Sequence, residues 1–320
     1  MTVPVIGLLR SKHPEIKITI LTTEVFSVLF SQVPNINFIF FKSKHKTLSG
    51  LYSLSKDINN LNPDYVLDLH NVLRTKLLRV FSVFSCNNIK ANFILDKGRK
   101  EKKELIKGAT FRQLKSMHQR YADVLCGLNI KLDLRNFKYY KKIDISNKNY
   151  NFNIQNKIIG IAPFAGHICK EYSLTKIIEI IASLNDTYEI LIFGGPGDEA
   201  KKIKEICKTN KNTHNITTDY SLEEQMGVIS NLDLMISMDS ANGHIASLFG
   251  INVLTIWGAT HPFTGYAPYM QPEINSITPD RKNYPKLPVT IYGSNCPKDY
   301  LDAINSIKTK TILKRVEELI

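Results

Sequence analysis

The sequence has few cysteines and no long apolar run, and both absences narrow the class of protein. Its five cysteines are scattered without a Cys-x-x-Cys pair, which argues against a disulfide framework and against a zinc site. No segment approaches the roughly 20 consecutive apolar residues that a membrane span requires. The N-terminus also lacks a basic start followed by an apolar signal segment. Together these absences predict a cytosolic protein.

Acidic residues are scarce in the first half of the chain. Residues 1–150 hold 26 Lys and Arg against 11 Asp and Glu, while residues 151–320 hold 16 against 18. The net charge of +13 therefore comes from the first half, which predicts an anionic partner for it. No RNA-binding motif accompanies the basic residues, so we expect no nucleic-acid partner. An anionic inner-membrane surface or a phosphorylated glycolipid is the favoured partner. A generally basic surface without such a partner is the alternative.

Strand and helix patterns alternate along both halves, which predicts α/β domains with parallel sheets. The chain of 320 residues is long enough for two domains, and the polar stretch 146–156 is the best linker candidate. We therefore expect domains at 1–150 and 151–320, with a ligand-binding cleft between them. The basic segment 97–107 is expected to be a solvated loop or an exposed helix. The expected strands are 17–22, 37–41, 65–69, 157–162, 189–193 and 234–238, and the expected helices are 48–61, 72–84, 174–184, 199–208 and 221–231.

Residues 236–258 hold the most informative pattern. An apolar run ends before Asp239 and Ser240, a short helical pattern follows, and a second apolar strand comes after it. This order places unpaired backbone N–H groups at the carboxyl edge of a sheet, where open α/β sheets hold phosphates. Asp239, Ser240 and His244 line that edge, so the predicted site offers donors, a carboxylate and an imidazole to an anionic ligand. A plain connector in which Asp239 only caps the helix is the alternative.

Several motifs, in order, resemble glycosyltransferase family 9, the ADP-heptose:lipopolysaccharide heptosyltransferases. Asp239-Ser240-x-x-x-His244-x-Ala246, followed by Gly258-x-Thr260-x-Pro262, is similar to the family signature. The likeness spans nearly the whole chain. It implies a GT-B fold, in which two Rossmann-like domains face one another, with the acceptor on the first and the sugar nucleotide on the second. Further similar segments are 68–75, 118–121, 161–172, 194–199 and 220–223.

The resemblance implies a role for each matched residue on the donor side. Lys170 would pair with the donor diphosphate and stabilise the charge that develops as the nucleotide departs. Glu199, or its neighbour Asp198, would bind the ribose hydroxyls, and Tyr220 would lie near the adenine. Asp239 would contact the sugar. The other expected donor-binding residues lend N–H groups to the phosphates or surround them: Ala165, Gly166, Ser240, Ala241, Asn242, Gly243 and His244.

The acceptor side is expected in the first half of the chain. The resemblance implies acceptor binding by Asp68, His70, Asn71, Arg74 and Arg120, although His70 and Asn71 stand where the family has Gln-Gly. No Asp-x-Asp pair occurs in the sequence, so neither a metal-bound diphosphate nor another cofactor is expected.

Structural alternatives stay open for several of these residues. Lys170 could be a solvated surface lysine, and Glu199 a first-turn acid favoured by the helix dipole. Tyr220 could pack beneath a Ser221 cap, and Asp68 and Arg74 could form a helix-capping ion pair.

One family element is not found in the sequence. The family's first strand and its Gly-Asp turn, which carries the expected general base, should precede the first helix. Residues 5–10 already have the pattern of that helix, so the chain is expected to begin within the motif, with a true start upstream or with impaired activity. A general base contributes roughly 10²–10⁴-fold in rate. Asp68 and His70 are the only nearby candidates for that role.

The expected function is that of an inverting glycosyltransferase, cytoplasmic and peripheral to the inner membrane. It would move a heptose, or a related sugar, from a nucleotide diphosphate such as ADP-heptose to the lipopolysaccharide core or lipid A acceptor. Two alternatives remain: a non-catalytic nucleotide- or glycolipid-binding protein that has lost its base, and a sugar-nucleotide epimerase with the same two-domain architecture.

Overall fold

The computed structural model describes residues 1–85, 89–147, 150–184, 186–217 and 220–320. Its chain contacts form two compact units. The larger unit comprises Met1, residues 99–116 and residues 139–320, and the smaller unit comprises residues 2–98 and 117–138. The expected linker, 146–156, thus belongs to the larger unit, although its residues 148 and 149 lie outside the described residues. The domain boundary expected at residue 150 stays a prediction.

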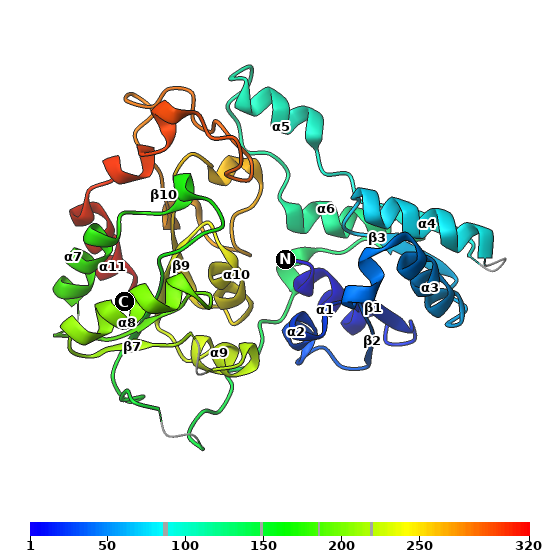
Figure 1. Ribbon diagram of the computed structural model, residues 1–320, viewed down its shortest axis with the longest axis horizontal. Coiled ribbons are helices and arrows are strands. Elements are labelled where there is room, and N and C mark those ends of the chain that lie inside the picture. Colours follow the sequence, from blue (N-terminus) through cyan, green and yellow to red (C-terminus); the bar gives the residue numbers. More distant parts are fainter. Residues whose placement is uncertain (86–88, 148–149, 185, 218–219) are drawn as a thin grey trace. The chain divides into compact units, whose positions relative to one another are not determined.

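The larger unit is built on a six-stranded sheet in which every neighbouring pair is parallel (Figure 1). The strand order is β10-β9-β8-β5-β6-β7, so β5 and β8 lie side by side at the centre. Both central strands are buried along their full length, as expected for a parallel sheet covered on both faces. The strands are β5 (Ile158–Ala162), β6 (Glu189–Ile192), β7 (Thr213–Asn215), β8 (Leu234–Met238), β9 (Asn252–Ile256) and β10 (Ser276–Ile277).

Helices cover both faces of this sheet (Figure 1). One face packs against α7 (Leu174–Leu184), α8 (Asp198–Thr209) and α11 (Thr309–Leu319), whose isoleucines and Val316 share a core with alternate residues of β5, β6, β8 and β9. The other face carries α9 (Leu222–Ile229) and α10 (Ala241–Leu248). This two-layer covering of a parallel sheet confirms the predicted α/β class.

The smaller unit contains two separate pairs of parallel strands. β1 (Ile18–Thr22) pairs with β2 (Ile36–Phe40), and β3 (Tyr65–Asp68) pairs with β4 (Ala91–Ile94). The strand expected upstream of Met1 lies outside the sequence and stays a prediction. The helices of this unit are α1 (Val3–Lys12), α2 (Glu24–Ser27), α3 (Leu48–Asn59), α4 (Leu73–Ser85) and α6 (Met117–Val124), of which α3 packs on α4 and α1 on α6.

The segment 97–107 departs from its prediction. It contains the helix α5 (Arg99–Ile106), so the helical alternative is confirmed. The helix is not fully exposed, however, because one side of it is buried in the larger unit. Lys102 is only 3% exposed, and its ammonium lies 4.3 Å from the centre of the Tyr266 ring. Its Nζ donates to the Tyr266 hydroxyl at 3.1 Å. A lysine stem can cover apolar surface while its charge meets an aromatic face, so charge density alone did not predict exposure here.

No helix among the described residues is both long and apolar enough to cross a membrane.

Candidate functional site

The expected donor-binding residues lie at one edge of the six-stranded sheet. Because its strands are parallel, the loops that follow them leave the sheet at the same side, the carboxyl edge. The loop after β5 carries Lys170, the loop after β8 carries Asp239, and the loop after β9 carries Thr260. The turn after β6 leads into α8 with Glu199. Residues distant in the sequence are thus gathered within the larger unit.

Lys170 and Asp239 form an ion pair at this edge. The distance from Lys170 Nζ to Asp239 Oδ2 is 3.0 Å, and the two side chains are 12% and 11% exposed. The Thr260 hydroxyl donates to the same carboxylate oxygen at 3.2 Å. Lys170 is therefore not a solvated surface lysine, which rules out that alternative. A mostly buried ammonium requires an anionic partner, and the Asp239 carboxylate is that partner here.

The position of Lys170 depends on contacts that the sequence did not reveal. The neighbouring Cys169 is buried, its carbonyl oxygen accepts from the Ala259 N–H at 3.0 Å, and its thiol donates to the Gly293 carbonyl at 3.3 Å. Gly293 has φ +92°, and a Cβ there would lie 2.7 Å from Lys170 Cδ. Glycine suits this position because the backbone lies in the left-handed region and the Lys170 side chain approaches it closely. Gly293 is thus a site residue that sequence analysis missed, since no local pattern links it to Lys170.

The start of α10 faces the same edge. Its N-cap residue, Ser240, has an extended backbone (φ −146°, ψ 174°), and its hydroxyl lies 3.1 Å from the Ser237 hydroxyl rather than on the first turn of the helix. Gly243 lets the helix pack tightly on β8, because a Cβ there would lie 3.1 Å from Ser237 Oγ. The backbone N–H groups of Ala241 and Asn242 therefore head a helix without a side-chain cap, an arrangement that suits an anion. The alternative in which Asp239 caps α10 is wrong.

Ala165 and Glu199, two of the expected donor-binding residues, already form hydrogen bonds within the larger unit. The Ala165 N–H donates to Glu171 Oε1 at 3.1 Å, so the Glu171 carboxylate would have to move before a phosphate takes its place. The Glu199 Oε2 accepts from the Gly195 N–H at 2.6 Å, which fixes this carboxylate over the turn between β6 and α8. Gly166 is exposed. Asp198, the second ribose candidate, is exposed and pairs with Lys201 at 3.2 Å.

Tyr220 lies at the start of α9, after β7. Its ring stacks on the ring of Tyr150, with 5.7 Å between centres and 19° between planes. The Ser221 cap is confirmed and is part of a capping box, since Ser221 Oγ accepts from the Glu224 N–H and Glu224 Oε2 accepts from the Ser221 N–H. A role for Tyr220 beside an adenine stays a prediction.

Next to Thr260, an aromatic cluster encloses a histidine. His261 is 7% exposed, and its Nδ1 accepts from the Phe263 N–H at 3.1 Å. Its ring packs on Phe111 and Phe263, with centres 5.2 and 4.5 Å away. Burial lowers the pKa of His261 to about 4, and the nearby Arg281 guanidinium adds to this effect. His261 is therefore neutral at physiological pH and contributes packing and a backbone hydrogen bond.

The expected acceptor-binding residues gather in the smaller unit, at the carboxyl ends of β3 and β4. Asp68 is buried, and its Oδ1 accepts from the N–H groups of His70 (3.0 Å) and Asn71 (2.7 Å). Its Oδ2 lies 3.0 Å from Arg79 Nε. The Asn71 side chain donates to the Leu95 carbonyl, and its φ of 45° lies in the left-handed region that Asn tolerates. Asp68 therefore shapes the turn, and its ion pair involves Arg79 instead of Arg74.

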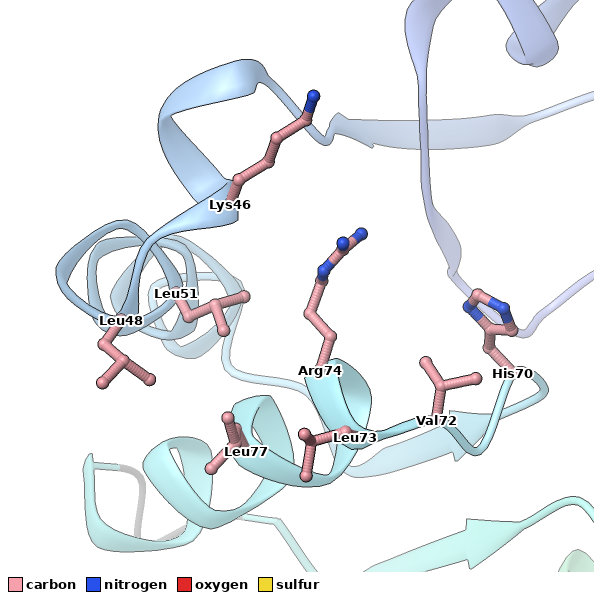
Figure 2. A pocket seen from close by; sticks show the side chains of 8 residues that line it. All are labelled: Lys46, Leu48, Leu51, His70, Val72, Leu73, Arg74 and Leu77. Atoms are coloured by element: carbon pink, nitrogen blue, oxygen red, sulfur yellow. The ribbon is translucent and has the colours of Figure 1, made fainter.

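A pocket of about 430 Å³ opens beside this turn (Figure 2). Three cationic or titratable side chains enter it from different segments: Lys46, His70 and Arg74. Burial lowers the pKa of His70, as does the positive charge of Lys97. The remaining lining is apolar and comes from Leu48 and Leu51 of α3 and from Val72, Leu73 and Leu77 at α4.

Arg120, on α6, lies against the residues that follow β4. Its guanidinium is 4% exposed and lies 3.5 Å from both the carboxylate and the carbonyl oxygen of Asp96. A Cβ at Gly98 would come within 2.3 Å of Arg120 Nη2, so this guanidinium packs directly on the backbone. The structure thus brings Asp68, Asn71 and Arg120 together around residues 95–98.

The fold is that of a GT-B glycosyltransferase. A glycosyltransferase of family 9 from Veillonella parvula matches with a TM-score of 0.74 and 19% identity, covering 99% of this chain and 92% of that one. The ADP-heptose lipopolysaccharide heptosyltransferase II of E. coli matches with a TM-score of 0.69 and 15% identity, covering 99% and 94%.

The sequence identifies the family within this fold. Residues 52–290 match glycosyltransferase family 9 (heptosyltransferase), and the chain belongs to that family. It is similar to lipooligosaccharide heptosyltransferase 2 of Campylobacter jejuni (21% identity over 92% of this chain and 87% of the relative). It is also similar to the lipopolysaccharide core heptosyltransferase OpsX of Haemophilus influenzae (22% identity over 96% and 84%). The resemblance predicted from the motifs is confirmed, and the protein is a glycosyltransferase.

Proposed function

We propose that this glycosyltransferase moves a heptose, or a related sugar, from ADP-heptose to the lipopolysaccharide core, with inversion at the anomeric carbon. The family supports sugar transfer, and the names of the relatives from C. jejuni and H. influenzae support the heptose and the lipopolysaccharide or lipooligosaccharide acceptor. The observation that carries the donor site is the buried Lys170–Asp239 pair beside the start of α10.

On the donor side, the diphosphate would take the place of Asp239 as the partner of Lys170. The Lys170 ammonium and the N–H groups of Asn242 and Gly243 would then stabilise the charge that grows on the departing diphosphate. Asp239, released from the lysine, would be free to accept from the sugar hydroxyls. Glu199 would bind the ribose, Tyr220 would lie near the base, and Ala165, Gly166, Ser240, Ala241 and His244 would complete the phosphate surroundings.

On the acceptor side, the cationic pocket of the smaller unit would bind the anionic groups of the lipopolysaccharide core. Arg74 and His70 enter it with Lys46, while Asp68 and Asn71 hold the turn that presents His70. Arg120 would complete the acceptor side near residues 95–98. An acceptor embedded in the inner membrane implies an enzyme at its cytoplasmic surface. In an inverting reaction the acceptor hydroxyl oxygen attacks the anomeric carbon on the face opposite the departing diphosphate, and in the intact site a carboxylate would take the hydroxyl proton.

The test is a transfer assay with ADP-heptose, a UDP-sugar and a GDP-sugar, each with and without a lipopolysaccharide core acceptor. The proposal predicts a glycosylated acceptor and free ADP, formed only when both substrates are present. Conversion of the nucleotide sugar without acceptor would instead identify an epimerase. ADP binding without any product would identify a non-catalytic nucleotide-binding protein.

A further inference from the structure

We propose that the starts of α3 and α4 form a docking surface for an anionic lipid bilayer, with Leu48 and Leu73 entering the interface between exposed cations. We call this surface the α3–α4 patch, formed by Leu48, Tyr52, Leu73 and Val80 with Lys46, Lys56, Arg74 and Lys76. The inference rests on the proposed function in one respect: an acceptor embedded in the membrane would require the enzyme to contact the membrane surface.

The two helices of the patch pack against each other. Near their starts, Leu48 and Leu51 of α3 line one pocket together with Leu73 and Leu77 of α4 (Figure 2). One turn further along, the rings of Tyr52 and Phe81 meet edge to face with 5.9 Å between centres. Both helices therefore begin at the same end, and their first residues lie on a common surface of the smaller unit.

The patch exposes apolar side chains that the core does not use. Leu73 is 74% exposed and Leu48 65%, the highest values among the leucines of the described residues. Val80 (49%) lies seven residues after Leu73, and Tyr52 (46%) lies four after Leu48, so each pair continues along one side of its helix. Exposed apolar rows of this kind mark interaction surfaces when charged residues border them.

Cations border these apolar residues closely. Residues 43–59 and 73–85 contain six Lys and Arg and a single acid, Asp57. The Lys56 ammonium lies 4.6 Å from the centre of the Tyr52 ring, and the Arg74 guanidinium lies 4.8 Å from that of Phe41. Lys46, Lys56, Arg74 and Lys76 are all exposed.

This charge and shape fit a bilayer better than a protein groove. Long cationic side chains reach phosphate groups while neighbouring leucines enter the boundary between headgroups and acyl chains. Several cations near an anionic leaflet add their attraction, which salt weakens. The patch also shares Lys46, Leu48, Leu73 and Arg74 with the lining of the cationic pocket, so docking would bring that pocket to the membrane surface where an amphiphilic acceptor lies.

The test is flotation of the full chain with vesicles of phosphatidylcholine alone or of phosphatidylcholine with about one third phosphatidylglycerol. We expect binding to the anionic vesicles at least about tenfold stronger than to the neutral ones, with release at high salt. The double variant Leu48→Ser, Leu73→Ser should lower binding about tenfold. Lys56→Gln with Lys76→Gln should lower it and reduce its salt dependence.

Matched controls come from elsewhere on the surface. Val25 and Ile274 are each 63% exposed and lie outside the patch, and Val25→Ser with Ile274→Ser should leave vesicle binding unchanged. Lys310→Gln with Lys314→Gln, at exposed positions on α11, should do the same. Thermal unfolding of each variant separates a lost contact from a lost fold.

The inference is overturned by equal binding to both vesicle types, by no binding at all, or by a Leu48→Ser, Leu73→Ser variant that binds as the wild type does. Self-association that this variant abolishes, without vesicle binding by the wild type, would assign the patch to a second copy instead. Transfer by the wild type to an acceptor without lipid chains tests the proposed function separately. Transfer without vesicle binding would contradict the docking surface alone and leave the proposed function in place.

Discussion

Lys170 and Asp239 leave the ends of two adjacent parallel strands, β5 and β8, and meet in an ion pair of 3.0 Å. Neither side chain is more than 12% exposed, so the lysine is held without the competition of bulk water. A phosphate that enters this edge would meet an ammonium already in place, at the start of a helix whose dipole favours the same charge. In the proposed donor site, this carboxylate would therefore hold the lysine in place until a diphosphate binds.

Replacing the lysine tests its role in transfer. Lys170→Ala should lower kcat for sugar transfer by about 10²–10³-fold, because one strong stabilising group for the developing diphosphate charge is lost. Steady-state kinetics and thermal unfolding measure the effect and the integrity of the fold. Lys208→Ala is the matched control, since Lys208 is 58% exposed and pairs with Glu205 on the same helix. Equal turnover of Lys170→Ala and wild type would remove Lys170 from the mechanism.

Replacing the carboxylate should separate binding from transfer. In Asp239→Asn, no negative charge competes with the diphosphate for Lys170, so ADP should bind about threefold more tightly or better. Transfer should nevertheless fall, because the proposed contact from the carboxylate to the sugar would be weakened. Calorimetric titration with ADP and an assay of transfer measure the two effects. Weaker ADP binding by this variant would show that Asp239 does not compete with the donor for the lysine.

The turn after β3 should depend on its buried carboxylate. Asp68→Ala removes an ion pair with Arg79 and two backbone hydrogen bonds, and it should lower the free energy of unfolding by roughly 3 kcal/mol. The nearby Asp64–Lys90 pair is the control. Both of its side chains are more than 60% exposed, so Asp64→Ala should change stability by less than about 1 kcal/mol. Denaturant unfolding of the two variants compares them, and similar losses would contradict a structural role for Asp68.

The buried His261 should make stability depend on pH. Its pKa is lowered to about 4 in the folded protein, while an unfolded histidine titrates near 6.5. The folded state binds fewer protons between these values, so its stability is complete above about pH 6.5 and falls as the pH drops toward 4, by roughly 3 kcal/mol in total. His261→Asn, which keeps an acceptor for the Phe263 N–H, should remove this part of the pH dependence. Parallel stability curves for wild type and variant between pH 4 and 6.5 would contradict it.

Sequence patterns predicted most of the larger unit, because its strands are continuous apolar runs and its helices have clear apolar faces. The predicted strands 157–162 and 234–238 correspond to β5 and β8. The short strands β4 and β7 were not predicted, since three or four residues carry too little periodicity.

The site was predicted only in part, for a physical reason. Family motifs pointed to Lys170, Asp239 and the start of α10, which the sheet brings together through its parallel order. The contacts that fix Lys170 come from Gly293, more than a hundred residues away, and no local spacing encodes such an approach. Likewise, the burial of Lys102 depends on Tyr266, which only the folded chain places beside it.

The most direct test of the donor site is calorimetric titration of the full chain with ADP. Wild type should bind one ADP, and Lys170→Ala should bind it at least about tenfold more weakly while Lys208→Ala binds it as the wild type does. Failure of the wild type to bind ADP, or equal affinity in wild type and Lys170→Ala, would contradict a diphosphate site at the Lys170–Asp239 edge.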